Sequence, residues 1–339
     1  MLRSQFIGLG SFVPPRLVLN DDLEGLLEIS GRSIERRTGI RQRYWNADPT
    51  KGTSDLAYQA SLEALESAGL QASDLDLILF ATLSPDAAAP GSGCFLQRAL
   101  DVPGIPTLDV RQQCSGFLYG LSVADLYIRS GQYERVLLVG AECQSKLLDM
   151  TPRGRNVTCL FGDGAGAVIL GPTEVKDGTP QGGERCLYST HLHSDGGRLG
   201  HLLWQHPGSM NERFLMPSLL GELESHPQMR GRELFDICLE LMPEVSREAL
   251  EAGGCTAQDV DLFVIHQTNA RLNQEYAALM GVPEERVFST IQDFGNTTAA
   301  TIPIGLREAQ RAGRLKPGDL VLSCSFGSGL SWASALYRW

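Results

Sequence analysis

Cys114 stands where a thiol can act as a nucleophile. It lies between a short apolar segment, 106–110, and a stretch with helical spacing of apolar residues that ends at Gly131. We therefore expect Cys114 at a strand-to-helix turn. There the helix macrodipole stabilises a thiolate and lowers the thiol pKa, and Gly116 allows a tight backbone turn. A thiol activated in this way takes up acyl groups as thioesters. The alternative interpretation is a buried cysteine with no chemical role.

Two further residues have the types and positions of catalytic groups. His266 ends a continuous apolar run, 262–266, and a histidine at the carboxyl end of a buried strand faces the crevice where α/β proteins bind ligands. Asn296 precedes a segment of small residues and is expected at another loop-to-helix junction. Taken singly, each residue has a simpler interpretation: the histidine is satisfied by backbone groups, and the asparagine caps a helix.

Two glycine-rich segments, 161–166 and 326–329, each lead into an apolar strand. A dinucleotide-binding glycine motif opens a helix instead, so a nucleotide-phosphate site is not expected here. In the second segment, a backbone amide of Gly327 or Ser328 is placed to help form an oxyanion hole, which is usually the largest contribution to acyl-transfer catalysis.

The elements that carry these residues belong to an internal repeat. Residues 62–81 and 247–266 match at a constant offset, and each copy reads as a helix, a glycine stop, an aspartate-containing turn and an apolar strand. His266 stands where the first copy has Ala81. Weaker matches link 130–142 with 312–327, and 161–170 with 326–336.

The repeat predicts two related α/β halves, 1–172 and 173–339, which give a layered α/β architecture. The connection falls in the glycine-rich, charged segment 173–185. Residues 201–232 contain proline, glycine, methionine and histidine without clear periodicity, and we expect them to form a cap or insertion loop over the site.

Composition excludes several classes of function. The chain has 339 residues and a net charge of -11, which argues against a general nucleic-acid binder. No segment approaches the roughly 20 apolar residues that span a bilayer, and residues 1–16 lack the features of a signal peptide. The eight cysteines form no CxxC pair, so we expect free thiols and a cytoplasmic protein. His191 and His193 share one strand face without a third ligand nearby, so we expect a structural role and no metal site.

Together, these segments resemble the β-ketoacyl-acyl-carrier-protein synthase III family of the thiolase superfamily, collinearly over essentially the whole chain. The matching motifs are RTGIRQR (37–43), CSGF (114–117), FGDGAG (161–166), STHLHSDG (189–196), GRELF (231–235), HQTNARL (266–272), GNTTAATIP (295–303) and FGSGLSWASALYRW (326–339). The resemblance implies a five-layered αβαβα thiolase fold, a homodimer, a Cys-His-Asn active site, and no metal or redox cofactor.

Carried over from the family, Cys114 accepts an acyl group from an acyl thioester. The backbone amides of Cys114 and Ser328 hold the oxyanion. His266 and Asn296 donate hydrogen bonds to the thioester oxygen of a malonyl-type unit, and they stabilise the enolate that forms as this unit loses carbon dioxide. The enolate carbon then attacks the acyl group on the cysteine.

The resemblance also implies where the substrates bind. Arg37, Arg155 and Asn269 match positions that contact coenzyme A or phosphopantetheine, and Arg271 matches a position that docks the acidic carrier protein. The expected partners are therefore acyl-CoA and acyl carrier protein. Neighbouring arginines predict a basic rim that steers such partners to the site.

Two residues depart from the family pattern. Ser33 replaces a tryptophan that stacks on the adenine of coenzyme A, which favours carrier-bound acyl chains. Ala89 replaces a bulky phenylalanine that crosses the dimer and shortens the acyl pocket, which favours a longer or bulkier chain. We therefore expect a specialised ketosynthase of fatty-acid or natural-product biosynthesis, rather than a primer enzyme specific for acetyl-CoA.

Three alternatives have different chemistry. The first is a thiolase-fold acyltransferase that passes the chain to an oxygen or nitrogen nucleophile without decarboxylation, although it would not need Asn296. The second is a papain-type hydrolase, which requires a CGSCW-like context for its cysteine that Cys114 lacks. The third is a degenerate partner subunit, which the intact trio of residues disfavours.

Overall fold

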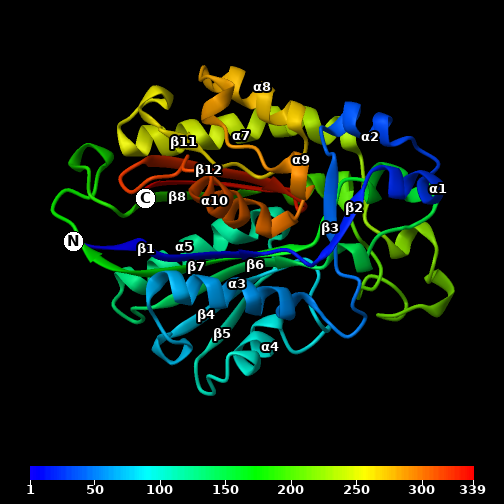
Figure 1. The fold of residues 1–339 in the computed structure, drawn as a ribbon, viewed down its shortest axis with the longest axis horizontal. Helices are drawn as coiled ribbons and strands as arrows, with labels where there is room; N and C mark the ends of the chain where they lie inside the picture. The colour runs from blue at the N-terminus through cyan, green and yellow to red at the C-terminus, as the bar shows by residue number, and fades with distance from the viewer.

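A computed structural model describes residues 1–339, and the chain folds into five layers (Figure 1). Two outer layers of helices enclose two β-sheets, and a further layer of helices lies between the sheets. This is the αβαβα arrangement predicted from the sequence. The largest buried clusters lie at these layer boundaries, so the layers are held together mainly by apolar burial.

The first sheet has the strand order β1-β7-β6-β4-β5. Its strands are β1 (Leu2–Phe12), β4 (Leu77–Ala81), β5 (Thr107–Val110), β6 (Val136–Glu142) and β7 (Gly164–Glu174). β4 and β6 are buried throughout and pair in parallel, as continuous apolar runs covered on both faces should. The helices on its two faces are α3 (Thr53–Ala68) and α4 (Ser92–Ala99) outside and α5 (Gly116–Arg129) inside.

The second sheet has the strand order β11-β12-β13-β8. Its strands are β8 (Leu187–Ser194), β11 (Leu262–Phe263), β12 (Leu320–Gly327) and β13 (Ser331–Arg338). The helices on its faces are α10 (Thr301–Arg311) inside and α7 (Gly231–Gly253) and α8 (Ala270–Met280) outside. Backbone N–H groups of Val264 and His266 still donate to β12, so the parallel pairing of β11 continues to His266.

The two sheets repeat each other in register. Leu77 pairs with Val136 and, at the same offset along the chain, Leu262 pairs with Val321. The helices that precede β4 and β11 both end at a glycine in the left-handed conformation, and an aspartate caps the following turn in both copies. The predicted duplication is therefore confirmed.

The duplication extends to the two turns that open the central helices. Gln113 (φ 43°) and Thr298 (φ 52°) are both non-glycine residues with positive φ, and they lie just before α5 and α10. Cys114 and Ala299 follow them and occupy equivalent positions. Since the repeat also aligns His266 with an alanine, each half supplies one chemically reactive residue where the other half has none.

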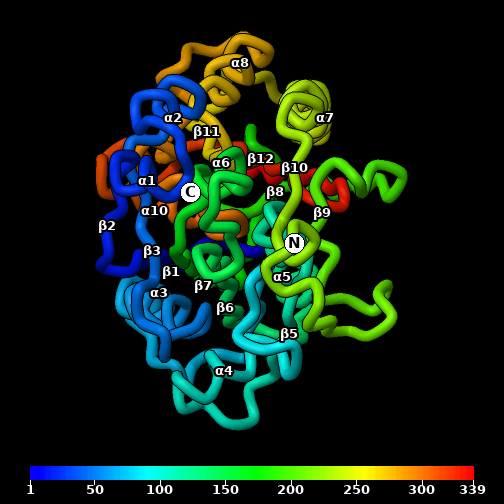
Figure 2. Tube along the Cα trace, turned by 90° about the vertical axis from the view of Figure 1, so that its right-hand side faces the viewer, coloured from blue at the N-terminus to red at the C-terminus, as the bar shows by residue number.

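Smaller elements surround this core. They are β2 (Arg16–Leu19), α1 (Glu24–Leu27), α2 (Gly31–Thr38), β3 (Gln42–Trp45), α6 (Arg155–Thr158), β9 (Leu202–Leu203), β10 (Gln228–Met229) and α9 (Ile291–Phe294). Figure 2 shows α2 beside α8, which brings an N-terminal element against the second half. All eight cysteines are free thiols, and six of them are buried. No helix has the length and apolar character needed to cross a bilayer.

Candidate active site

Cys114 lies in a short 3-10 turn, Gln113–Ser115, between β5 and α5, as its sequence context predicts. The expected role of Gly116 is wrong, because its φ of -56° is helical and the positive φ falls on Gln113. Gly116 is needed for close packing instead: a Cβ there would lie 3.1 Å from the Cβ of Ala81 and 3.8 Å from that of Ala299. The nucleophile turn therefore packs tightly against the counterparts of His266 and of Cys114 in the duplication.

The expected lowering of the thiol pKa is also wrong. Cys114 is only 7% exposed, and burial raises the pKa of its thiol to about 12 because the thiolate is poorly solvated. The charge of Glu142 acts in the same direction, whereas hydrogen bonds from the backbone N–H groups of Cys114 and Ser328 offset part of the effect. Desolvation thus outweighs the hydrogen bonds from these two N–H groups.

Glu142 is a buried carboxylic acid that the sequence analysis did not single out. It ends β6, and burial raises its pKa to about 7. It accepts hydrogen bonds from the Ser84 hydroxyl at 2.6 Å, from the backbone N–H of Leu83 at 3.0 Å, and from the backbone N–H of Ala299. Glu142 therefore links the turn before α10, in the second half, to the first sheet. A charged residue closing an apolar run was the signal for it in the sequence.

His266 is completely buried at the end of the β11 segment. Its Nδ1 lies 2.7 Å from the Thr301 hydroxyl oxygen, and its Nε2 has no hydrogen-bond partner. Burial lowers the imidazole pKa to about 3, because a cation cannot be solvated in this position. The site therefore holds a neutral imidazole with one ring nitrogen fixed and the other available.

Asn296 serves two purposes. Its Oδ1 accepts a hydrogen bond from the backbone N–H of Thr298 at 2.8 Å, so it does cap the turn before α10. This bond orients the side-chain amide and leaves Nδ2 without a protein acceptor. The simple interpretation of Asn296 and the catalytic one are thus compatible, because each uses a different atom.

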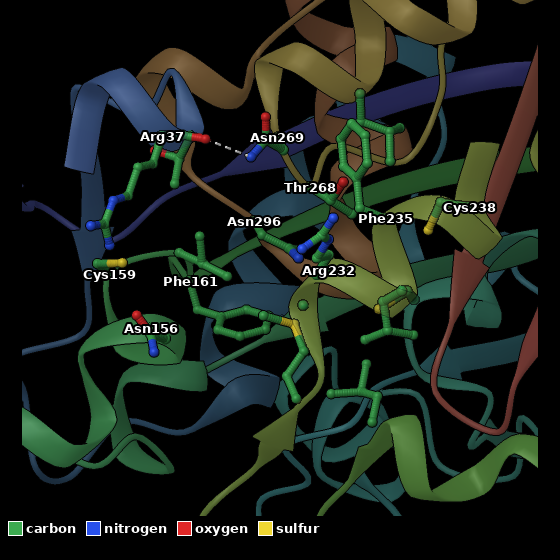
Figure 3. A pocket seen from close by; sticks show the side chains of 18 of the residues that line it. Arg37, Asn156, Cys159, Phe161, Arg232, Phe235, Cys238, Thr268, Asn269 and Asn296 are labelled. Atoms are coloured by element: carbon green, nitrogen blue, oxygen red, sulfur yellow. Dashed lines mark hydrogen bonds between the residues drawn. The ribbon is translucent and has the colours of Figure 1, made fainter. Parts of the chain in front are cut away.

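One cavity of about 550 Å³ brings the three residues together. Cys114, His266 and Asn296 all contribute to its lining, along with the substrate-binding candidates Arg37, Arg155 and Asn269. The dashed line in Figure 3 marks the hydrogen bond from Asn269 Nδ2 to the carbonyl of Arg37 at 3.0 Å. Asn269 Oδ1 accepts from the backbone N–H of Arg271, so the side chain joins α2 to α8 at the cavity wall.

A second, smaller cavity of about 160 Å³ also reaches Cys114. Residues of the predicted cap segment 201–232 line both spaces: Leu202 belongs to both, Met229 to the larger and Trp204 to the smaller. Within this segment, β9 and β10 form a two-stranded antiparallel ladder, which the sequence did not reveal. The buried thiol therefore lies at the junction of two cavities, and one segment covers both.

Other predicted residues lie outside these cavities. The Arg271 side chain is 71% exposed, approaches Glu275 at 3.5 Å and sits over the ring of Phe235, which lines the larger cavity. Ala89 lies on an exposed loop and lines neither cavity of its own chain, and Ser33 lines neither.

The two histidines weighed as metal ligands have protein partners. His191 and His193 both contact Glu248, at 3.1 Å and 2.6 Å.

Three residues at the site were missed in the sequence. Thr301 positions His266, Arg232 projects into the larger cavity, and Arg111 lines the smaller one. Arg111 stands three residues before Cys114, between strand and nucleophile, where an unusual charge was visible in the sequence. The roles of Thr301 and Arg232 depend on contacts between distant segments and had no local signal.

The five layers, the duplicated halves and the cysteine at the opening of a central helix define an acyl-transferring enzyme of the thiolase fold. Residues 108–196 match the family model of 3-oxoacyl-[acyl-carrier-protein (ACP)] synthase III, and residues 250–339 match the model of its C-terminal part. A β-ketoacyl-[acyl-carrier-protein] synthase III of Rhodospirillum rubrum is 43% identical over 340 residues, which cover 100% of both chains.

Solved structures agree. The 3-oxoacyl-[acyl-carrier-protein] synthase III from Aquifex aeolicus VF5 has a TM-score of 0.88 and 36% identity, covering 99% of this chain and 100% of its own. The priming β-ketosynthase from the R1128 polyketide biosynthetic pathway has a TM-score of 0.87 and 30% identity, covering 99% of this chain and 96% of its own. The chain belongs to the β-ketoacyl-acyl-carrier-protein synthase III family and is an acyl-transferring ketosynthase, as the motifs predicted.

Proposed function

We propose that this ketosynthase loads an acyl chain on Cys114 and condenses it with a malonyl-type thioester by decarboxylation. The observation that carries this proposal is the convergence of the Cys114 thiol, the unpartnered Nε2 of His266 and the free Nδ2 of Asn296 on one cavity. A buried nucleophile and two buried hydrogen-bond donors suit a reaction that develops negative charge on oxygen.

In the loading step, the Cys114 sulfur attacks the carbonyl carbon of an acyl thioester. A new carbon–sulfur bond forms, the old one breaks, and the departing thiol of coenzyme A or phosphopantetheine takes up the proton. The backbone N–H groups of Cys114 and Ser328 both point at the sulfur, so they are placed to hold the oxyanion of the tetrahedral intermediate. Because the resting thiol is protonated, its proton leaves as the sulfur attacks, and the neutral His266 is the base we assign to this transfer.

In the condensation step, the carbon–carboxylate bond of the malonyl unit breaks and its electron pair forms an enolate. His266 Nε2 and Asn296 Nδ2 donate hydrogen bonds to the enolate oxygen. Carbon dioxide leaves, the enolate carbon attacks the acyl carbonyl and a carbon–carbon bond forms. The bond from the acyl carbon to the Cys114 sulfur breaks, and the sulfur leaves as a thiolate that a proton from water returns to the thiol. Neither step needs an external oxidant or reductant, so the proposed reaction uses no metal or redox cofactor, as the resemblance implies.

The two steps require different tautomers of His266, and Thr301 can support both. Its hydroxyl oxygen lies within hydrogen-bond reach of His266 Nδ1 and, at 3.0 Å, of the Thr298 carbonyl. When the hydroxyl donates to Thr298, Nδ1 carries the ring proton and Nε2 accepts the thiol proton. When it donates to Nδ1, Nε2 carries the proton that the enolate needs.

We propose acyl-CoA and acyl carrier protein as substrates and partners. Arg37 and Arg155 place cationic donors on the larger cavity, where they suit the phosphates of either carrier, and the exposed Arg271 lies beside this cavity, where it suits an acidic partner. The name of one structural relative places such an enzyme in polyketide assembly. Ser33 supports a carrier-bound donor, and Ala89 supports a longer or unusual acyl chain in such a pathway.

We also propose a homodimer. β5 is an edge strand of the first sheet, and Leu108 on it is 43% exposed, so a second copy could extend the sheet there. In such a dimer, Ala89 of one copy would approach the acyl cavity of the other.

Intact-protein mass spectrometry after incubation with a panel of acyl-CoA and acyl-carrier thioesters tests the loading step. We expect an acyl adduct that disappears in Cys114→Ala and persists in the control variant Cys94→Ala, which changes an exposed cysteine. Release of carbon dioxide from malonyl thioesters, lost in His266→Ala and Asn296→Ala, tests condensation. Transfer to an alcohol or amine without carbon dioxide release would support the non-decarboxylating acyltransferase instead.

A further inference from the structure

The smaller cavity at Cys114 is lined by both apolar and polar side chains. The apolar lining includes Leu83, Leu202, Leu203 and Trp204. The polar lining includes Arg111, Gln113 and Gln144. A cation and two amides are an unusual lining for a space that receives a hydrocarbon chain, because each of these groups loses water when such a chain enters.

The polar groups retain hydrogen-bonding capacity that the protein does not use. Gln144 is 1% exposed, and its Nε2 donates to the Thr298 hydroxyl at 2.8 Å, whereas its Oε1 has no partner. Neither Arg111 nor Gln113 makes a side-chain hydrogen bond, and no acidic residue forms an ion pair with Arg111. A purely hydrocarbon chain would leave these groups without compensation.

The cavity also connects a buried residue with an exposed one. Its lining includes the sulfur-bearing residue Cys114, which is buried, and Arg111, which is exposed. The space therefore extends from the buried nucleophile to a partly hydrated guanidinium. An anion at that end exchanges water for a charge-assisted, two-pronged pair with Arg111, and the fork geometry of arginine fits a carboxylate. The amide of Gln113 adds a further donor to the cavity lining.

We infer that the acyl chain accepted by Cys114 ends in a carboxylate, so that the substrate is the half-thioester of a short dicarboxylic acid. This inference rests on the proposed function, because it requires an acyl group on Cys114. The methylene groups lie against the leucines and Trp204, and the terminal carboxylate binds Arg111. Loading proceeds by thioester exchange: the bond from the acyl carbon to the coenzyme A sulfur breaks as the bond to the Cys114 sulfur forms, and the released thiol takes the proton.

The test compares chains that differ in charge and match in shape. Full-length protein is incubated with succinyl-CoA or glutaryl-CoA and with their respective uncharged isosteres, isocaproyl-CoA and 5-methylhexanoyl-CoA, and the initial rate of Cys114 acylation is followed by intact mass. We expect the carboxylated chains to load faster than their isosteres in the wild type. In Arg111→Met, which keeps an unbranched apolar stem, we expect loading of the carboxylated chains to fall roughly 10- to 100-fold while the uncharged chains keep their rate.

Two further variants control for net charge and cavity polarity. Arg16→Met removes an exposed arginine on β2 and should leave both rates unchanged. Gln144→Leu removes the unpaired amide oxygen and should raise the loading of uncharged chains, with thermal unfolding reporting whether the variant is folded.

The outcomes are distinguishable. If uncharged chains load faster than carboxylated ones in the wild type, or if Arg111→Met slows both equally, the inference is overturned and the proposed function stands. If no donor acylates Cys114, the proposed function fails and the inference fails with it.

Discussion

His266 Nδ1 lies 2.7 Å from the Thr301 hydroxyl oxygen, while the other ring nitrogen of His266 has no partner. Thr301 is the first residue of α10, so the central helix of the second half fixes the orientation of the catalytic imidazole. This hydrogen bond is the only polar contact of the ring, and the ring is otherwise held by packing.

Replacing Thr301 by valine should therefore impair catalysis without removing the site. A lost hydrogen bond of about 1.5 kcal/mol corresponds to a step that is roughly tenfold slower, and both loading and condensation should slow because each depends on the His266 tautomer. Steady-state kcat with malonyl and acyl thioesters measures the effect. Thr301→Ser, which restores the hydroxyl, should recover most of the rate. If valine is as active as serine, Thr301 has no role in positioning His266.

The depressed pKa of His266 predicts an unusual pH profile. A pKa of about 3 means that the imidazole stays neutral throughout the range in which an ordinary histidine, near 6.5, would gain a proton. Carbon dioxide release from a malonyl thioester should thus show no acid limb near pH 6.5. The same shift makes stability fall as the pH drops from 6.5 towards 3, because the unfolded histidine binds a proton that the folded one cannot. An acid limb near pH 6.5 in the wild type that persists in Glu142→Gln, which removes the other buried group with a pKa near neutrality, would contradict this prediction.

Gly116 should tolerate no side chain. A Cβ at this position would lie 3.1 Å from the Ala81 Cβ, a neighbour on a fully buried strand that has little freedom to move. We expect Gly116→Ala to cost about 1–3 kcal/mol of unfolding free energy, as overpacking in a core usually does. Chemical denaturation measures this loss. Gly25→Ala is the matched control, because a Cβ there meets open space, and equal stability of the two variants would refute the packing argument.

The positions of the reactive residues followed from sequence patterns, whereas their environments did not. The apolar runs placed Cys114 after a strand, and together with the internal repeat they placed His266 at the end of a buried strand, because strands leave a clear local signature. The thiol pKa did not follow, since desolvation depends on how the two halves pack and outweighs the helix dipole that a local pattern predicts. The backbone strain at Gln113 was equally hidden, because glutamine carries no preference for positive φ.

The cap segment is a second reason why the environment of the reactive residues could not be predicted from the sequence. Residues 201–232 have no periodicity that would predict which side chains turn inward, yet Leu202, Trp204 and Met229 complete both cavities around the thiol. The polar lining that includes Arg111 belongs to a cavity only because this segment supplies Leu202, Leu203 and Trp204.

Glu142 provides a test of electrostatics inside the site. Its charge raises the pKa of the Cys114 thiol, and its own pKa, raised to about 7 by burial, means that it is mostly ionised at pH 8 and mostly protonated at pH 6. Glu142→Gln should thus increase the thiolate fraction of Cys114, and its alkylation by iodoacetamide, at pH 8, with little difference from the wild type at pH 6. Peptide-resolved mass spectrometry separates this signal from that of the exposed Cys94, whose rate should not change. An increase of the same size at both pH values would show that the variant opens the site, rather than removing a charge from beside the sulfur.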